Sequence, residues 1–376
     1  MDQRSVPDRL VEQRQRCTGE KQDRHKDSFI VMIITQMQYF FLFVASYVIV
    51  GALTPIMRKI AISKEILDRP NSLHKSHLKP TPYLGGVAII LGVVCVTYSA
   101  LIVSKLSASN YWLATSLLAP AIFMGLIGLW DDIKDLHPFP RFVGQTVAGV
   151  VVAIILILTS NFGTPTGSIA IDVFVTVIWI VGICNSINFF DNLDGGAAGT
   201  TAVSSIALTY LAIINDQNLI GALSLVLAGA TLGFLIWNRS PARIYMGDAG
   251  ALFLGVLIAT LTIRLNPDTK SISASFATPI LLLAVPILDT TVAVISRLRR
   301  KVSPFQGGKD HLSHRLIRTG ISRKFTAVLL WALSAFFALL AIILNQNFAI
   351  NELVILIFSG IIWLFLLLKF LNTPDI

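Results

Sequence analysis

Residues 218–248 contain the two kinds of sequence from which the whole chain is built: NLIGALSLVLAGATLGFLIW, followed by NRSPARIYMGD. The first part, residues 218–237, carries no charged side chain and is long enough, as a helix, to cross the hydrocarbon core of a bilayer. The second part, residues 238–248, brings together Arg, Asp, Pro and Gly. The same alternation recurs along the chain, so the sequence predicts a membrane protein whose chemistry lies between its spans.

The composition supports this interpretation. Of the 376 residues, 54% are hydrophobic and 14% are charged, whereas soluble domains carry about 25% charged residues. The formal net charge of +9 would suggest nucleic acid if the basic residues formed a patch on a soluble surface. They lie between spans instead, so we expect a membrane partner and no nucleic acid. Cys17, Cys95 and Cys184 are too scattered for a ligand cluster or a disulfide framework.

The apolar blocks predict an all-α membrane bundle of about 11 transmembrane helices. We expect residues 37–370 to form one transmembrane catalytic domain, preceded by a polar and disordered tail over residues 1–36. Met32 and Met37 are alternatives to Met1 as the translation start. The expected spans are 37–57, 83–104, 111–130, 142–160, 172–189, 197–214, 218–237, 249–265, 276–296, 325–345 and 350–370.

The basic residues predict the orientation of the bundle. If the first span enters from outside, the inner side holds 20 of the 23 Lys and Arg residues that follow position 28, and the outer side holds only Lys105, Arg264 and Lys270. The positive-inside rule then places the N-terminus outside and the C-terminus inside. Nearly all Asp, His and Asn residues fall in the expected cytoplasmic loops, which are 58–82, 131–141, 190–196, 238–248 and 297–324.

Two adjacent acids, Asp131 and Asp132, close the third expected span, and Lys134 follows them as a candidate for binding substrate. Neighbouring carboxylates at a membrane interface repel each other and lose solvation, which a shared cation or proton relieves. A charged helix end in the headgroup zone is an equally good explanation of the pair taken alone.

A denser polar string, Asn188-Phe-Phe-Asp191-Asn-Leu-Asp194-Gly195-Gly196, ends the fifth span. If the backbone is helical here, Asn188, Asp191 and Asp194 share one face. That face would suit a hydroxylated or cationic group, and the two glycines would let a phosphate approach the free N–H groups of the next helix. A plain hydrophilic turn is the alternative.

Two further acids are separated in sequence. Asp248 begins the eighth span at the positive end of a helix, where a carboxylate is held ionised for metal binding or acts as an N-cap. Asn238 lies ten residues before it, in the same loop. Asp289 lies inside the ninth span, and we expect it to be a structural support paired with Arg297 or with a helix hydroxyl.

The loop 297–324 combines a basic cluster with His311, His314 and Arg315. The cluster up to Lys301 suits anionic lipid headgroups. Two imidazoles three residues apart beside an arginine suit a phosphate, and no thiolate or third histidine lies near enough in sequence to favour zinc. Acids that bind a divalent cation, bases that bind phosphates and a bilayer that supplies a lipid together predict phosphoryl transfer to or from a membrane lipid.

At these residues the chain resembles the bacterial polyprenyl-phosphate N-acetylhexosamine-1-phosphate transferases. The matching motifs are Asp131-Asp132, Asn-x-x-Asn-x-x-Asp-x-x-Asp-Gly ending at Gly195, Pro241-Ala-x-x-x-Met-Gly-Asp248 and the histidine loop, in order through about residues 37–370. The resemblance is greater to the undecaprenyl-phosphate GlcNAc-1-phosphate transferases than to the MurNAc-pentapeptide translocase. It implies transfer of GlcNAc-1-phosphate from UDP-GlcNAc to undecaprenyl phosphate, release of UMP, and a requirement for Mg²⁺ or Mn²⁺. Another UDP-N-acetylhexosamine donor is the alternative.

The resemblance also implies roles and a location. Asp248 corresponds to a metal ligand supported by Asn238, which is also a candidate for binding substrate. Asp132 and Asp194 correspond to further metal ligands. Asp131 and Asp132 correspond to acids that bind metal or deprotonate the lipid phosphate. The other implied contacts are those of Asn188, Asp191 and Asp194 with nucleotide and metal, and those of His311, His314 and Arg315 with the diphosphate and sugar.

Relatives have His-x-His-His where this chain has Ser313 in the middle position. The resemblance further implies a multi-pass protein of the bacterial inner membrane with its active site facing the cytoplasm. A homodimer is possible.

Two rival classes fit less well. The CDP-alcohol phosphotransferases also use Asp-x-x-Asp-Gly, but they continue with Ala-Arg and two more acids, whereas this chain continues with Gly-Ala-Ala-Gly-Thr-Thr after Gly195. A transporter would place polar residues at the middle of the bilayer, and Asp289 is the one clear intramembrane acid in the predicted spans.

Overall fold

The computed structural model describes residues 36–68, 80–159, 166–265, 271–304, 308–346 and 351–373. Within these ranges ten helices are long and apolar enough to cross a membrane, and a sharply bent pair of shorter helices makes an eleventh candidate span. The all-α membrane bundle expected from the sequence is therefore confirmed. The expected N-terminal tail lies outside the described residues up to position 35.

The long helices make up most of the described chain. They are the first described helix Gln36–Ser63, α2 (Gly85–Val103), α3 (Ala108–Lys134), α4 (Pro138–Leu158), α5 (Ile169–Phe190), α6 (Gly196–Ile214), α7 (Asn218–Asn238), α8 (Gly247–Arg264), α12 (Arg323–Asn345) and α13 (Glu352–Asn372). The shorter elements are β1 (Leu67–Asp68), β2 (Thr81–Pro82), α9 (Ile272–Leu282), α10 (Ala284–Arg299) and α11 (Leu312–Arg318).

Helix α8 forms the centre of the bundle and packs against α2, α3 and α5. Its contact with α3 depends on Gly128, because a Cβ atom there would lie 2.2 Å from the backbone oxygen of Asp248. In the same way, a Cβ atom at Gly86 of α2 would lie 2.1 Å from the backbone nitrogen of Gly250. The glycines bring three helix backbones into direct contact at the first turn of α8, which fixes the position of Asp248.

The ninth span is broken, which corrects the expectation of one helix over residues 276–296. Helices α9 and α10 meet at Leu283 with a bend of 75°. Pro286 has no N–H group for the carbonyl of Leu282, four residues before it, and the Ser204 hydroxyl of α6 donates to that carbonyl at 2.6 Å instead. Close to the bend, the indole N–H of Trp363 in α13 donates to the backbone carbonyl of Ala284 at 3.1 Å.

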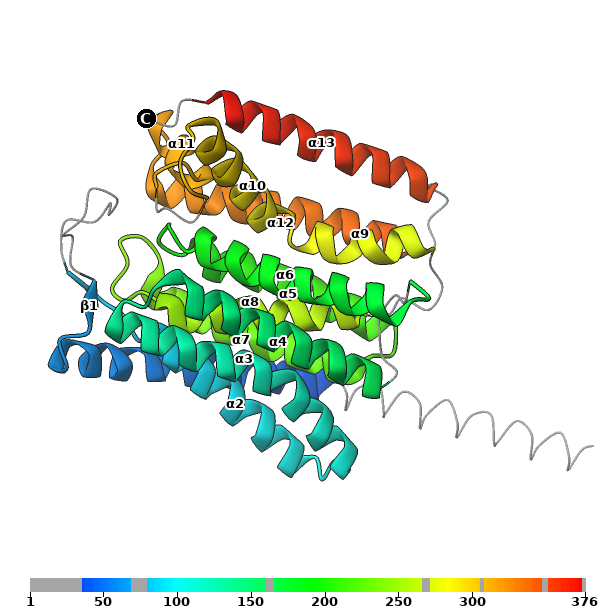
Figure 1. Cartoon of the computed structure of the whole chain (residues 1–376). Coiled ribbons are helices and arrows are strands. Elements are labelled where there is room, and N and C mark those ends of the chain that lie inside the picture. The colour runs from blue at the N-terminus through cyan, green and yellow to red at the C-terminus, as the bar shows by residue number, and fades with distance from the viewer. Residues whose placement is uncertain are drawn as a thin grey trace, which may run out of the picture.

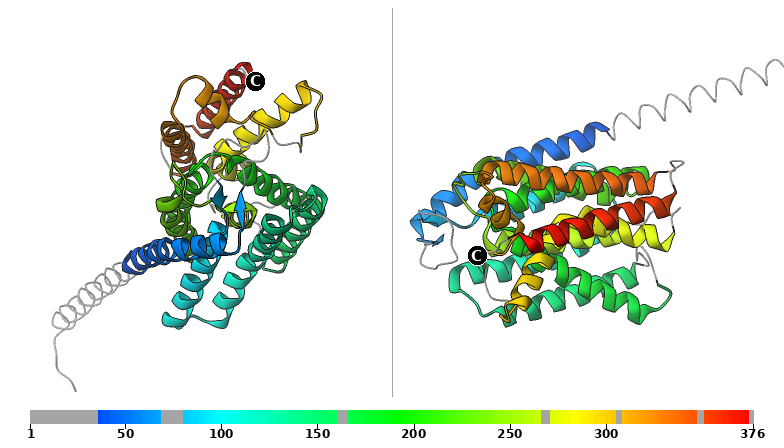
Figure 2. Two further views of the ribbon diagram at one scale, coloured as in Figure 1. Left: turned by 90° about the vertical axis from the view of Figure 1, so that its left-hand side faces the viewer. Right: turned by 90° about the horizontal axis from the view of Figure 1, so that it is seen from above.

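The polar connections gather at one end of the bundle. Figure 1 shows the helices running side by side, with β1, α11 and the carboxyl end of α13 at the same end. In the end-on view of Figure 2 the short hairpin lies near the middle of this end, and the first helix lies at the edge. The hairpin is tied to the α7–α8 connection, because Tyr245 donates its N–H to the carbonyl of Pro82 at 2.9 Å and accepts from Gly85 at 3.0 Å.

Three local expectations need correction. Asp131 and Asp132 belong to the last turn of α3 and not to a loop. Helix α5 ends at Phe190, so Asp191 and Asp194 lie in a turn and do not continue one helical face with Asn188. The loop 297–324 contains the short helix α11, which His311 precedes.

Candidate active site

A cavity of about 590 Å³ opens at the end of the bundle where the polar connections meet. Five separate parts of the chain line it: the hairpin, the α3–α4 corner, the end of α5, the α7–α8 connection and the segment between α10 and α12. Seven of its lining residues are aspartates, which are Asp68, Asp131, Asp132, Asp135, Asp191, Asp194 and Asp248. The four acids expected to meet, from three separate motifs, therefore share one cavity: Asp131, Asp132, Asp194 and Asp248.

Asp132 holds the first turn of α8 in place. Its carboxylate oxygens accept hydrogen bonds from the backbone N–H groups of Asp248 at 2.8 Å and Ala249 at 3.0 Å. These are N–H groups that a helix start leaves without a partner inside the helix. Met246, which precedes α8, gives no side-chain cap. Asp132 therefore supplies the cap from α3, and the expectation that Asp248 itself might cap the helix is corrected.

Asp248 is joined to the two neighbouring helices by its side chain. Its Oδ1 accepts from the Asn188 amide of α5 at 2.6 Å, and its Oδ2 accepts from the Arg141 guanidinium of α4 at 2.7 Å. Both donors stabilise the charged form of a carboxylate. The arrangement keeps Asp248 in the cavity wall with both oxygens oriented.

Arg141 was missed in the sequence. One of its nitrogens, Nη1, lies 2.6 Å from Asp131 and 2.7 Å from Asp248, so the guanidinium bridges acids that are 117 positions apart. Asp131 also accepts the backbone N–H of Leu136 at 2.6 Å, which closes the α3–α4 corner. The sequence signal was Pro138 and Pro140 after the acid pair, because proline at a helix start places the next residues in the first turn, close to the preceding helix end.

Asp191 differs in its support from Asp131, Asp132, Asp194 and Asp248, whose carboxylates all accept hydrogen bonds. It follows α5 and lines the cavity, and its carboxylate receives no hydrogen bond from the described residues. Burial, together with the negative charges of Asp248, Asp132 and Asp194, raises the pKa of Asp191 well above its ordinary value. A cation or a proton placed here would relieve that repulsion.

Asp194 and Asn238 hold two connections together. Asp194 accepts the backbone N–H of Ala242 at 3.1 Å and also lines the cavity. The Asn238 amide accepts from the N–H of Gly195 at 2.9 Å and donates to the carbonyl of Ile244 at 3.0 Å. Asn238 is buried away from the cavity wall, and Lys134 is exposed outside it, so neither predicted substrate contact is among the lining residues.

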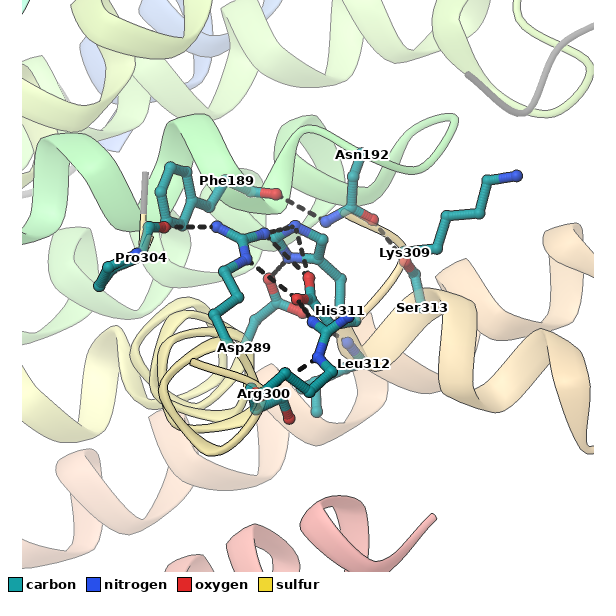
Figure 3. Close-up of polar contacts among 12 residues, drawn as sticks. Phe189, Asn192, Asp289, Arg300, Pro304, Lys309, His311, Leu312 and Ser313 are labelled. Atoms are coloured by element: carbon teal, nitrogen blue, oxygen red, sulfur yellow. Dashed lines mark hydrogen bonds and ion pairs between the residues drawn. The ribbon is translucent and has the colours of Figure 1, made fainter. Parts of the chain in front are cut away.

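The histidine loop is fixed by a buried network, drawn in Figure 3. Asp289 accepts from Nδ1 of His311 at 2.7 Å and from the backbone N–H of Leu312 at 2.7 Å. The structural role expected for Asp289 is thus present, but its partner is His311 and not Arg297. Arg297 instead forms a two-pronged ion pair with Asp310, with both N–O distances at 2.9 Å.

Arg315 corrects the expectation of a substrate contact. It is 1% exposed, and it is absent from the cavity wall. Its guanidinium donates to the carbonyls of Asp310 and Phe370 at 3.0 and 2.8 Å and to the hydroxyl of Ser296 at 2.6 Å. The residue therefore ties the loop to α10 and to the carboxyl end of α13, where helix carbonyls favour a positive charge.

His314 and Ser313 complete the loop. His314 lines the cavity, and burial lowers its pKa to about 4, so its imidazole is neutral at pH 7. The Ser313 hydroxyl donates to the side-chain oxygen of Asn192, while the Asn192 amide donates to the carbonyl of Phe189 at 2.6 Å. Ser313, which stands where relatives have a histidine, thus connects α11 to the turn that carries Asp191 and Asp194.

The donor set suits a hard divalent cation. Among the described residues, no three or more His, Cys, Asp or Glu side chains already surround a metal-sized position. Mg²⁺, however, is usually held by one or two carboxylates together with substrate phosphates and water. The oxygen-rich wall and the unsupported Asp191 carboxylate fit an ion that binds together with a diphosphate.

The chain matches known proteins across the same residues. The model of glycosyl transferase family 4 matches residues 114–266. The chain is 34% identical over 312 residues to the probable undecaprenyl-phosphate N-acetylglucosaminyl 1-phosphate transferase of Bacillus subtilis, covering 81% of this chain and 84% of that protein. It is 31% identical to the decaprenyl-phosphate N-acetylglucosaminephosphotransferase of Mycobacterium tuberculosis, covering 68% and 70% of the two chains. A phospho-N-acetylmuramoyl-pentapeptide-transferase of Staphylococcus carnosus is 29% identical, covering 62% and 77%.

Proposed function

Because the chain belongs to glycosyl transferase family 4, with the polyprenyl-phosphate N-acetylglucosamine 1-phosphate transferases, we propose that it transfers GlcNAc-1-phosphate to undecaprenyl phosphate or a similar polyprenyl phosphate. The donor is UDP-GlcNAc, UMP is released, and the lipid-diphosphate sugar starts the synthesis of a cell-envelope polysaccharide. The observation that carries this proposal is the meeting of acids from α3, the end of α5 and α8 in one cavity.

The bond changes follow from the two substrates. An oxygen of the lipid phosphate forms a bond to the sugar-bearing phosphorus of the donor. The bond between that phosphorus and the bridging oxygen breaks, and UMP leaves with the electron pair. The phosphates and the carboxylates repel one another, so Mg²⁺ or Mn²⁺, when bound, supplies charge neutralisation at the donor diphosphate.

We assign roles to the residues from their contacts. Asp248, together with Asp194, would hold the cation, and Asp132 keeps the end of α8 where Asp248 must lie. Asp191 is the best placed acid to take a remaining proton from the lipid phosphate, because its carboxylate receives no hydrogen bond from the described residues. Arg141 offers a positive charge to the phosphates from the opposite side of Asp248.

The test is transfer by the purified full chain. Radiolabelled UDP-GlcNAc or UDP-GalNAc is incubated with undecaprenyl phosphate, with and without Mg²⁺, and the lipid product and the released nucleotide are identified. We expect a metal-dependent lipid product from UDP-GlcNAc together with UMP. Release of UDP would mean a simple glycosyltransferase, and a product from UDP-GalNAc alone would change the donor.

Variants connect the reaction to the cavity. Asp248→Asn and Asp132→Asn should each lower turnover by about two orders of magnitude or more while the protein remains folded. Asp216→Asn is the matched control, because Asp216 is an exposed aspartate far along the chain from any lining residue. Near-normal turnover of either cavity variant would remove the role assigned to that residue.

A further inference from the structure

His311 lines the cavity, and both of its ring nitrogens already have partners. Nδ1 lies 2.7 Å from Asp289, which is fully buried in α10, and Nε2 lies 3.2 Å from Nη2 of Arg297. Figure 3 shows Asp289 on one side of the His311 ring, with Leu312 bound to the same carboxylate. The ring edge also packs against Phe189, with 6.0 Å between the ring centroids.

The two contacts determine where the ring proton lies. A guanidinium has five N–H donors and no acceptor, so Nε2 must accept from Arg297 and cannot itself carry hydrogen. A neutral imidazole carries one N–H, which is then on Nδ1 and donates to the Asp289 carboxylate. An imidazolium would place a second N–H against the positive charge of Arg297. The Asp310 Oδ1 atom lies 3.8 Å from Nε2, but it already accepts from the Nη2 group of Arg297 at 2.9 Å.

Arg297 is in turn held from several sides. Besides His311, it donates twice to Asp310 at 2.9 Å and once to the carbonyl of Pro304 at 2.7 Å, and its Cζ lies 5.2 Å from the centroid of the Phe189 ring. One N–H of Nη1 has no acceptor among the described residues. Arg297 also lines the cavity although it is only 2% exposed, so its positive charge acts on an anion bound there.

We propose that Asp289 and Arg297 hold His311 as the neutral Nδ1–H tautomer, so that His311 positions Arg297 for the donor diphosphate and does not carry a proton in the reaction. Asp289 and His311 are positioning residues in this scheme, which replaces the catalytic role predicted for His311. The identity of the diphosphate rests on the proposed function, whereas the tautomer rests on the contacts alone.

The tautomer is measured directly on the full-length protein in lipid nanodiscs. The chain has six histidines, so the protein is labelled with ¹⁵N-histidine, and the His311 signals are assigned as those lost in His311→Gln. We expect an unprotonated Nε2 and a protonated Nδ1 at pH 7. A protonated Nε2, or an imidazolium at that pH, would overturn the proposal.

The Asp289→Asn variant gives a second NMR test of the His311 tautomer. The Asn carbonyl can still accept from Leu312, but its amide nitrogen can only donate toward Nδ1 of His311. We expect the proton to move to Nε2, the contact with Arg297 to be lost, and the KM for the donor to rise more than kcat falls. An unchanged tautomer in this variant would show that Asp289 does not set it.

The activity arm compares His311→Gln with His311→Ala. Glutamine offers an NH2 donor group and a carbonyl acceptor but cannot exchange a proton with substrate, so it should retain at least about tenfold more kcat/KM than alanine, with the wild-type pH profile. Equal loss in both folded variants would contradict the proposal. If the wild-type protein makes no lipid product, the proposed function fails, and the NMR result still decides the tautomer.

Discussion

Adjacent residues of the same type make different contacts in this site, and these contacts distinguish their structural roles. Asp131 and Asp132 differ by one position, yet Asp131 binds Arg141 and the N–H of Leu136, while Asp132 caps α8. Sequence alone identified both as candidates for metal or proton chemistry. It could not show that Asp132 uses its two oxygens on another helix, since that helix begins 115 positions later.

Asp191→Asn should stabilise the fold while removing activity. The folded pKa of Asp191 is raised, so the folded protein retains a proton that the unfolded chain releases above about pH 3.9. Ionisation therefore lowers stability as the pH rises from that value through the folded pKa. We expect the variant to melt at a higher temperature than the wild type at neutral pH, and to melt at the same temperature near pH 3.5.

Melting curves across pH, followed by intrinsic fluorescence, measure this difference, and the transfer assay should show a loss of about 10²–10⁴ in kcat. Added Mg²⁺ should narrow the gap in melting temperature by neutralising the wild-type carboxylate. Asp216→Asn again serves as control. A variant that melts below the wild type at neutral pH would mean that Asp191 has a stabilising partner.

At the scale of elements, small residues and prolines decide how the helices meet. Pro286 breaks the ninth span, and Ser204 compensates the free carbonyl. The break places Asp289 one and a half turns after the bend, where its carboxylate reaches His311. Hydropathy predicted one continuous span because both halves are apolar, and a proline alone does not tell a kink from a sharp bend.

Gly128→Ala should uncouple α3 from the first turn of α8. The new methyl group would lie 2.2 Å from the Asp248 backbone oxygen and 2.6 Å from the Ala249 nitrogen, so the helices must separate and the Asp132 cap must weaken. Overpacking of this kind costs about 1–3 kcal/mol. We expect a lower melting temperature and a larger proportional loss of activity, because Asp248 moves with the helix end.

Gly182→Ala in α5 is the matched control, since a Cβ atom there would meet nothing within 4 Å. That variant should be neutral or more stable by about 0.5–1 kcal/mol, from the higher helix propensity of alanine. If both alanines behave alike, close backbone approach at Gly128 does not matter for the site.

At the scale of the whole molecule, the two ends of the bundle differ, because the aspartate-lined cavity lies at one of them. The hairpin and α11 lie at one end (Figure 1), and residues of that end line the cavity. The same end receives the segments that hold most of the basic residues, which is why we propose that it faces the cytoplasm, where a nucleotide-sugar donor is available.

Fusions test that orientation. Green fluorescent protein attached to the C-terminus should fluoresce, and alkaline phosphatase inserted after Asp216, in the connection between α6 and α7 at the opposite end, should be active. Active phosphatase inserted after Ser240, in the α7–α8 connection, would reverse the orientation and would place the cavity on the outer side.

The sequence by itself determined that the chain is a helical membrane protein, because apolar blocks about 20 residues long have no other stable solvent. It also indicated which acids line one cavity, because each stands in or next to a polar connection at the same end of the spans. Only the tertiary structure decided how those acids are held. Arg141 between Asp131 and Asp248, Asp289 on His311, and Arg315 on the end of α13 are contacts between distant segments. Such contacts depend on how helix backbones pack, and a hydropathy pattern carries no information about which side chain meets which across the bundle.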